Sequence, residues 1–301
     1  MFPIIPANSA AAASGNDEGV FGYGYVPGVL NVSMTNLISN AGVVATDTTG
    51  VGTARNGLGA CEYGGDKGLF GYGDSGGPSG PKSMTNKVSN VGVVATDTTG
   101  VGTSRRILAA CSYGGDKGIF GYGMTMTTSL SMTNLASNAG VVTTDVTGVG
   151  TARRYPAACE YGGDKGIFGY GEVVWLVSMS MTNLVSNAGV VTTDVTGVGT
   201  ARTAPSACAY GGDKGIFGYG YDNKSMTNLV SNAGVVSSDV TGVGTATANR
   251  AATQYGQDKG IFGYGEGPVS VTNLVSNAGV VTTDVTGVGT ARYGVKACSF
   301  N

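Results

Sequence analysis

Short apolar segments, separated by turns rich in glycine and asparagine, follow one another along almost the whole chain. One stretch shows the pattern well and predicts four strands, at 109–113, 117–123, 131–137 and 141–145. A GGD turn separates the first two strands, an Asn-Ala-Gly turn separates the last two, and TGVGT at 147–151 leads into the next stretch. The chain therefore reads as a series of antiparallel strands.

Apolar and polar residues alternate only weakly within these strands, which carry Gly, Ala, Ser, Thr and Val on both sides. A sheet with one face in water would alternate more strictly. We therefore expect both faces of most sheets to be buried, as they are where the blades of a β-propeller stack around an axis.

The pattern recurs six times. Its landmark is the Phe of a (V/L/I)FGYG segment, which stands at Phe21, Phe70, Phe120, Phe168, Phe217 and Phe262. The successive spacings are 49, 50, 48, 49 and 45 residues. A period of this length is typical of one propeller blade.

The two ends of the chain each hold the part of a repeat that the other lacks. The end at 296–300 matches the first strand of a unit, whereas the start at 16–21 matches the second strand. Pairing them completes a blade and leaves no long edge strand unpaired, whereas a solenoid would need capping repeats instead. The sequence predicts an all-β, six-bladed β-propeller over 16–301, with four antiparallel strands per blade. Its closing blade combines 296–300 with strands that start near Gly19, Thr35 and Gly42, and residues 1–15 form an N-terminal arm.

Composition supports a folded chain and argues against several partners. Glycine accounts for 54 of 301 residues, 41% are hydrophobic and the net charge is −2, a balance that disordered chains do not have. The 17 Lys and Arg residues form no basic stripe, so we expect no nucleic-acid partner. Because no apolar run approaches a membrane-spanning length and the N-terminus has no basic leader, we expect neither membrane insertion nor an export signal.

The repeat resembles two known groups of proteins. The order TAR, AAC, turn, FGYG, variable loop and two further strands is similar to a Kelch-type repeat, although GYG replaces the Kelch glycine doublet and the Kelch Trp is missing. The segments GGDKGIFGYG and SMTNLVSNAGVVTTDVTGVGTAR resemble tandem repeats in virion-associated proteins of tailed bacteriophages, over nearly the whole chain from about residue 16. This resemblance implies a tail, neck or fibre component that holds partners or touches a host surface.

The sequence offers little for catalysis. Histidine is absent, which excludes histidine-based acid–base catalysis and histidine-ligated metals. Aspartates recur in every unit after the fourth strand, and in five units within the GDK turn, and turn formation explains identical residues better than a catalytic pair does. One carboxylate in D-x-T-G-x-G is too few for a calcium loop. We predict no catalytic residue, no cofactor and no metal site.

Three other repeated residues have structural explanations. Arginines at 55, 105, 153, 202 and 292 stand before the first strand, where we expect bidentate pairing with a neighbouring Asp, while Thr247 replaces Arg in the fifth unit. Cysteines occupy the equivalent position in five units, at 61, 111, 159, 208 and 298, with Thr253 in the sixth, and they suit buried free thiols in a reducing cytoplasm. The repeated asparagines at 36, 86, 134, 183, 228 and 273 suit hydrogen bonds to strand or turn backbone, the alternative being a polar ring that recognises sugars.

All length variation lies in one loop per unit. Between GYG and the Ser before (M/V)TN the loops have 8, 9, 7, 8, 4 and 4 residues, and equivalent propeller loops emerge on the same face. The fourth loop contains the only Trp of the chain in an apolar run, which a partner would cover. The candidate partner-binding residues are the five of this apolar run, three residues of two other loops and three of the arm: Val173, Val174, Trp175, Leu176, Val177, Tyr25, Met124, Met126, Phe2, Ile4 and Ile5.

Three classes of function remain open. The leading one is a non-enzymatic virion structural or adaptor protein, assembled in the host cytoplasm, that docks onto other virion proteins as a homo- or hetero-oligomer. The alternative is a lectin-like propeller that binds a host-surface glycan. A propeller hydrolase is the poorest, because no nucleophile and acid stand out from the repeat.

Overall fold

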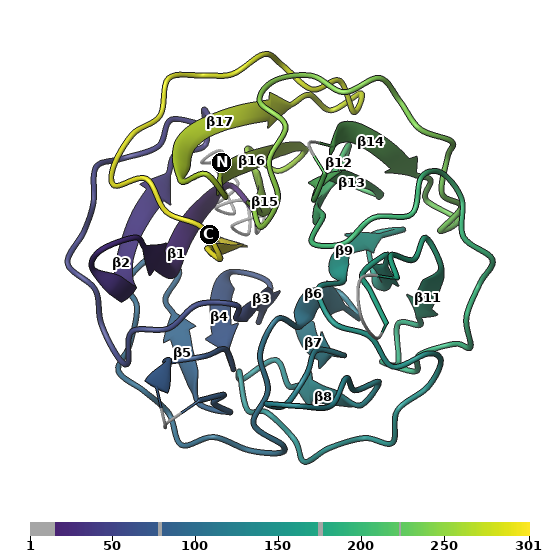
Figure 1. Ribbon diagram of the computed structural model, residues 1–301, viewed down its shortest axis with the longest axis horizontal. Coiled ribbons are helices and arrows are strands. Elements are labelled where there is room, and N and C mark those ends of the chain that lie inside the picture. Colours follow the sequence, from purple (N-terminus) through teal and green to yellow (C-terminus); the bar gives the residue numbers. More distant parts are fainter. Residues whose placement is uncertain (1–15, 78–79, 174–176, 223) are drawn as a thin grey trace, which may run out of the picture.

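A computed structural model describes residues 16–77, 80–173, 177–222 and 224–301; the predicted arm at 1–15 lies outside this range. Within it the chain is all-β, with six three-stranded antiparallel sheets and no α-helix, so no helix is long and apolar enough to cross a membrane. The six sheets lie around a common centre (Figure 1). This arrangement is compatible with a six-bladed propeller.

Each sheet has an inner, a middle and an outer strand. The inner strands surround the centre and each contacts the next one: β3 (Gly59–Tyr63), β6 (Ala109–Tyr113), β9 (Ala157–Tyr161), β12 (Ser206–Tyr210), β15 (Ala251–Tyr255) and β18 (Lys296–Phe300). The middle strands are β1 (Glu18–Val26), β4 (Lys67–Gly71), β7 (Lys117–Gly121), β10 (Lys165–Gly169), β13 (Lys214–Gly220) and β16 (Lys259–Gly265). The outer strands are β2 (Leu30–Ile38), β5 (Thr85–Val88), β8 (Thr133–Ala136), β11 (Thr182–Val185), β14 (Lys224–Val230) and β17 (Val269–Val275).

The two ends of the chain meet in one sheet, as the sequence predicts. Strand β18 pairs with β1 in the register Phe300 to Glu18 and Lys296 to Gly22, and β1 pairs with β2. The remaining five sheets take their three strands in chain order.

The predicted fourth strand is not a regular strand among the described residues. In the third unit its segment forms two isolated bridges with β8, Ala136 to Val142 and Thr133 to Val146, and a few further hydrogen bonds, but no continuous ladder. Every other unit has the same two bridges. Most positions between 141 and 147 are solvent-exposed, so few contacts hold this segment in a continuous ladder.

Glycines in the middle strands make the close stacking of the sheets possible. A Cβ on Gly121 would lie 2.7 Å from the ring of Phe168 in the next sheet, and a Cβ on Gly166 would lie 2.6 Å from the Cys111 sulfur of the previous sheet. The other five interfaces repeat this arrangement, with Thr253 replacing Cys in one. The K-G-I-F-G core of the repeat therefore alternates side chains that fill an interface with glycines that receive them.

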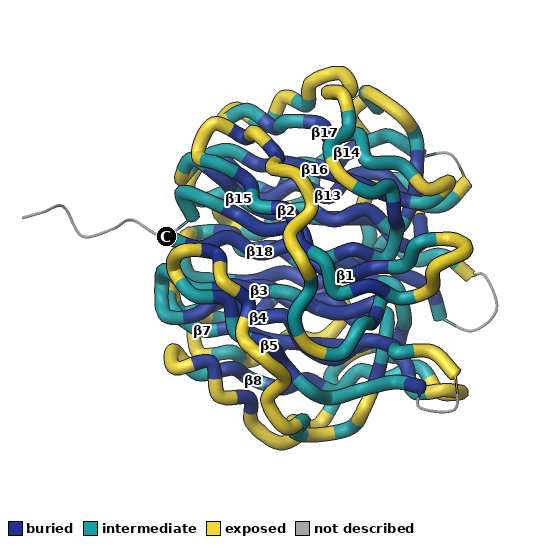
Figure 2. The backbone as a smooth tube through the Cα atoms, turned by 90° about the vertical axis from the view of Figure 1, so that its left-hand side faces the viewer, coloured by how far each residue is buried: buried dark blue, intermediate teal, exposed yellow. Residues whose placement is uncertain are grey.

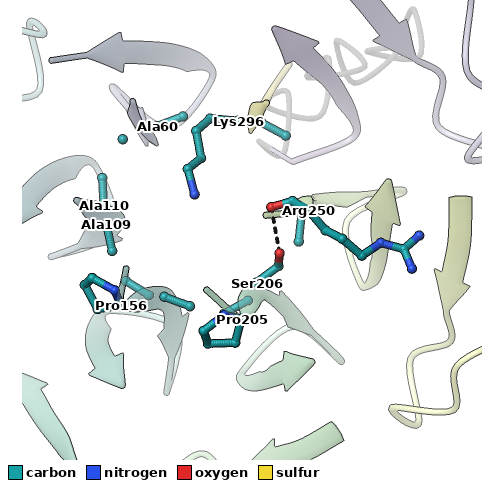
Figure 3. A pocket seen from close by; sticks show the side chains of 14 residues that line it. Ala60, Ala109, Ala110, Pro156, Pro205, Ser206, Arg250 and Lys296 are labelled. Carbon is teal, nitrogen blue, oxygen red and sulfur yellow. Dashed lines mark hydrogen bonds between the residues drawn. The ribbon is translucent and has the colours of Figure 1, made fainter. Parts of the chain in front are cut away.

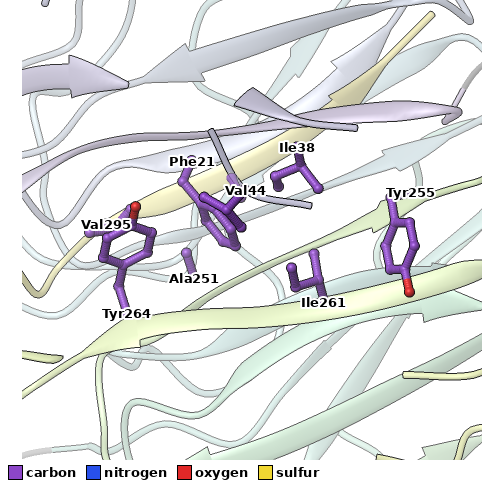
Figure 4. Close-up of a cluster of buried hydrophobic side chains, with 9 residues drawn as sticks. Phe21, Ile38, Val44, Ala251, Tyr255, Ile261, Tyr264 and Val295 are labelled. Atoms are coloured by element: carbon purple, nitrogen blue, oxygen red, sulfur yellow. The ribbon is translucent and has the colours of Figure 1, made fainter. Parts of the chain in front are cut away.

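Each interface also has an apolar core shared by two sheets. In the closing interface, Phe21 and Ile38 of the first sheet pack against Ile261 and Tyr264 of the last (Figure 4). The Phe21 and Tyr264 rings meet edge to face at 5.1 Å, and five further Tyr–Phe pairs repeat this contact around the molecule. Both faces of the middle strands are buried, as the weak alternation predicts.

Two rings of backbone hydrogen bonds connect all six sheets. In the first, each of six residues with positive φ donates its N–H to the carbonyl of its counterpart in a neighbouring sheet; the members are Gly57, Ile107, Tyr155, Ala204, Asn249 and Gly294. The second ring joins the residue after each inner strand to the Asp carbonyl of the next turn, and it closes through Gly256 to Asp17 and Asn301 to Asp66. The rings lie at opposite ends of the inner strands, so each end of the molecule is tied around its full circumference.

Candidate docking face and axial channel

The variable loops all leave the sheets at one end of the strands, whereas the GGD and NAG turns and the C-terminus lie at the other (Figure 2). We call these two ends the loop face and the turn face. Exposed apolar side chains on the loop face include Val29, Leu30, Met126 and Val177. One face therefore carries all the variation in loop length, as predicted.

The predicted partner-binding residues divide into three groups. Met126 and Val177 are exposed on the loop face, Tyr25 and Val173 are half-buried there, and Met124 is buried. Val174, Trp175, Leu176, Phe2, Ile4 and Ile5 lie outside the described residues. Met124 does not fit a contact surface in the free chain, because its sulfur packs inward and accepts a hydrogen bond from Arg154 at 3.6 Å.

Residues at the base of the loops form a belt in which the repeat is lost. The position after each GYG holds Tyr25, Asp74, Met124, Glu172, Tyr221 and Glu266 in turn. These side chains contact equally varied residues beside them: Arg106 with Asp74 and Arg154 with Glu172, both at 2.5 Å, and Tyr25 with Tyr293 at 5.2 Å between ring centroids. The belt is thus a surface of charged and aromatic groups whose residues and contacts differ from one unit to the next.

One part of the belt encloses a hollow of about 380 Å³. Its described lining residues come from two variable loops and from the segments that lead into β9 and β12: Arg154, Tyr155, Glu172, Ser178, Thr203, Tyr221 and Asp222. The Tyr155 and Tyr221 rings stand edge to face with their centroids 6.2 Å apart. The Tyr221 hydroxyl accepts a hydrogen bond from Asn249 and donates one to Glu266, which fixes that ring.

Burial alters the acidity of both tyrosines in the hollow. Burial is the main cause that raises the pKa of both Tyr155 and Tyr221. The nearby Tyr155 and Glu266 raise the pKa of Tyr221 further. Both phenols stay protonated at neutral pH. Tyr155 can therefore act as a hydrogen-bond donor, while the Tyr221 hydroxyl donates to Glu266.

A narrow channel follows the centre of the molecule between the inner strands. Small side chains line most of it, including Ala60, Ala110, Ala158, Ala207 and the neighbouring cysteines. Lys296 is the exception. Its five counterparts are Gly59, Ala109, Ala157, Ser206 and Ala251, so this amine is a single departure from the repeat.

The Lys296 side chain reaches into a cavity of about 40 Å³ in this channel, toward Pro156 and Pro205 (Figure 3). Burial lowers the pKa of its amine to about 8. Toward the turn face the channel widens to about 190 Å³ beside Glu62 and Glu160. Burial raises the pKa of these carboxyls to about 8 and about 7, and their mutual repulsion adds to the shift of Glu62.

Replacing Lys296 with Ala is expected to stabilise the fold, because the amine loses hydration in the channel and Ala stands at three of the equivalent positions. Below pH 8 both the folded and the unfolded lysine are protonated, and the cost of burial is fully present. Between pH 8 and the unfolded value of 10.5 the folded amine loses its proton first, so the cost falls as pH rises. We expect the variant to gain about 1 kcal/mol or more at pH 7.

The check is chemical unfolding of both proteins from pH 6 to pH 10.5. The advantage of the variant should shrink toward alkaline pH. Ala158→Gly, in the same channel, serves as a control without a titrating group. A difference between Lys296→Ala and the parent that is independent of pH would contradict the assigned burial.

The repeated Arg, Asn and Asp residues form a buried network between sheets. The Arg153 guanidinium donates to the Asn183 side-chain oxygen at 2.7 Å and lies 4.1 Å from the centre of the Tyr122 ring in the preceding sheet. Asp194 accepts hydrogen bonds from the backbone and hydroxyl of Thr151. Partial burial raises the pKa of Asp194, but the hydrogen bonds from Thr151 and Asn183 outweigh it and lower the pKa below its usual value. The Asp residues therefore act structurally.

Two expectations about this network are wrong. The five predicted Arg–Asp pairs are not bidentate, because their closest N–O distances are 3.7 to 3.9 Å. In most units the guanidinium donates to an Asn side chain instead. In the fifth unit Arg250, three residues after Thr247, restores the guanidinium and donates to Asn273 at 2.7 Å. Aligning the units by sequence does not reveal Arg250, because it lies three residues closer to the inner strand than the other arginines.

The repeated asparagines and cysteines are in the core. All six asparagines are fully buried, so they form no sugar-binding ring on the surface. All five cysteines are buried and unpaired, as predicted, and burial raises the pKa of each thiol. No group of three or more Cys, Asp or Glu residues in the described ranges is placed to hold a metal ion.

Sequence reasoning missed the hollow, the belt and Lys296. The belt and Lys296 were detectable as positions where aligned units differ, whereas the hollow depends on how neighbouring loops pack. No protein-family model matches this chain, and a comparison with curated proteins finds no match. The resemblance to Kelch-type repeats and to phage virion proteins stays a prediction.

Proposed function

We propose that the protein is a closed six-bladed β-propeller that serves as a non-enzymatic docking component of a tailed-phage particle. Each blade would consist of the three strands of one sheet and the outer bridged segment as a fourth element. The pairing of β18 with β1 and the two hydrogen-bond rings support closure. The assignment to a virion rests on the resemblance of the repeat.

The observation that carries the docking role is the contrast between the framework and the loop face. From the TN threonine to the TAR threonine, and from there to the Cys position, the spacing is the same in all six units. On the loop face, loop length and side-chain chemistry both change from unit to unit. Because a site requires a departure from symmetry, the loop face is the surface that can recognise one particular partner.

Replacing Val177 with Asp is expected to prevent docking, because a charge would enter an apolar contact on the loop face. Val177 is 54% exposed, so the fold itself should tolerate the change. Val190→Asp is the matched control, with the same chemistry at a 64% exposed position on the turn face. Purified particles that carry each variant are compared by quantitative mass spectrometry.

We expect the amount of Val177→Asp in particles to fall at least about tenfold, as for an interface residue that contributes on the order of 1.4 kcal/mol. The control should be incorporated like the parent chain. Equal incorporation of both variants would show that the loop face is not the docking surface. Absence of the parent chain from particles would remove the virion assignment.

A second candidate function, attachment to a host-surface glycan, is favoured by the hollow in the belt. Its volume and the polar groups among its described lining residues suit a small-molecule site. Both functions would use the same face.

A further inference from the structure

The hollow in the belt has a lining chemistry that differs from that of a protein-docking pocket. Its described walls consist of two tyrosines, an Arg–Glu pair, two hydroxyl residues and Asp222, with no aliphatic side chain among them. Interface anchors usually enter apolar pockets. Hydroxyl and charged groups beside aromatic rings instead suit a ligand that has both C–H surfaces and many hydroxyls.

The charges of the hollow argue against an anionic ligand. Arg154 donates to Glu172 at 2.5 Å, and Glu172 is only 3% exposed, so the guanidinium charge is already compensated. Asp222 is exposed at the rim and adds a negative charge. An anionic ligand would be repelled here, whereas uncharged hydroxyls can accept from Arg154 and donate to the carboxylates.

One hydroxyl in the wall lacks a partner. Thr203 is 7% exposed and lines the hollow, and its side-chain oxygen makes no hydrogen bond. A buried hydroxyl without a partner is costly. A ligand hydroxyl in the hollow would supply the missing partner.

We propose that this hollow is a binding site for a neutral saccharide unit, packed against the Tyr155 and Tyr221 rings and hydrogen-bonded to Thr203 and the Arg154–Glu172 pair. The inference rests on the proposed function of the loop face and names the ligand class of its second candidate. No other unit can form the same site, because Tyr155 has no tyrosine counterpart: the equivalent residues are Gly57, Ile107, Ala204, Asn249 and Gly294. The molecule would carry one such site per chain.

The test uses the isolated full-length chain on an array of immobilised neutral and acidic oligosaccharides, followed by titration of the best neutral oligosaccharide in solution. Thr203→Val is the decisive variant. Because the Thr203 hydroxyl has no partner in the free protein, its removal should leave the melting temperature unchanged or higher, while binding of the oligosaccharide falls at least about tenfold. Tyr293→Ala, in the Tyr25–Tyr293 pair on the same face, is the control and should bind like the parent.

The outcomes separate this inference from the docking role. Failure of the parent chain to bind any neutral oligosaccharide at millimolar concentration would overturn the saccharide site, while the Val177→Asp comparison would still decide docking. Binding that persists in Thr203→Val and Tyr221→Ala would also overturn the site. Equal loss in Tyr293→Ala would place binding elsewhere on the face, against the proposal.

Discussion

Deletion of residues 297–301 is expected to abolish the cooperative fold at ordinary temperatures. The deletion removes most of β18, which supplies the inner strand of the sheet that joins the two chain ends. It also removes Phe300, which is 1% exposed, and the Asn301 N–H that completes the ring of hydrogen bonds at the turn face. The first sheet would then expose β1 as an unpaired edge.

The size of the effect follows from what is lost. Burial of Phe300 and its small neighbours is worth about 3 kcal/mol, and the lost strand hydrogen bonds about 1 kcal/mol each. The sum exceeds about 5 kcal/mol, which is comparable to the whole stability of many domains. Thermal unfolding followed by circular dichroism measures it. Removing residues 2–14 from the other end is the control and should leave the melting temperature unchanged, while a deletion of 297–301 that melts like the parent would show that closure contributes little.

Replacement of Gly166 by Ala is expected to destabilise the protein by about 1–3 kcal/mol, as overpacking of a core does. The new methyl carbon would lie 2.6 Å from the Cys111 sulfur, which is buried between two sheets and has no room to withdraw. The backbone at Gly166 is not in the left-handed region, so the cost comes from the collision alone.

A second substitution isolates that collision. Cys111→Ala removes the sulfur, so the double variant with Gly166→Ala should recover part of the loss. Cys208→Ala removes the equivalent sulfur at a different interface, and it should not rescue Gly166→Ala. Chemical unfolding of the parent, the three single variants and the two double variants measures the coupling. Equal behaviour of the two double variants would mean that the glycine is required for another reason.

The sequence predicts the parts of this fold that repetition makes visible. The period predicts six sheets, and the split unit predicts the β18–β1 pairing, because both depend only on comparing segments of the chain. The small residues of the strands likewise predict close stacking, although only the structure shows that Gly166 faces Cys111 and Gly121 faces Phe168.

Repetition was a poorer guide to individual partners. The sequence register placed Thr247 where the guanidinium belongs, whereas Arg250 reaches the same position from three residues further along. The predicted fourth strand has strand-like composition but forms only bridges, because most of the segment at 141–147 faces solvent. The hollow depends on packing between Tyr155 and Tyr221, which are 66 residues apart, and no local pattern encodes such a contact.

The division of one sheet between the two ends of the chain also bears on how such a protein changes over generations. Unequal recombination between repeats this similar adds or removes whole units, and every product still begins with a middle strand and ends with an inner strand. The two ends remain complementary whatever the number of copies. Loss or gain of a unit would therefore alter the angle between adjacent sheets but not the pairing of the two chain ends. The packing of sheets around the centre, and not the pairing of the ends, would then limit the number of units.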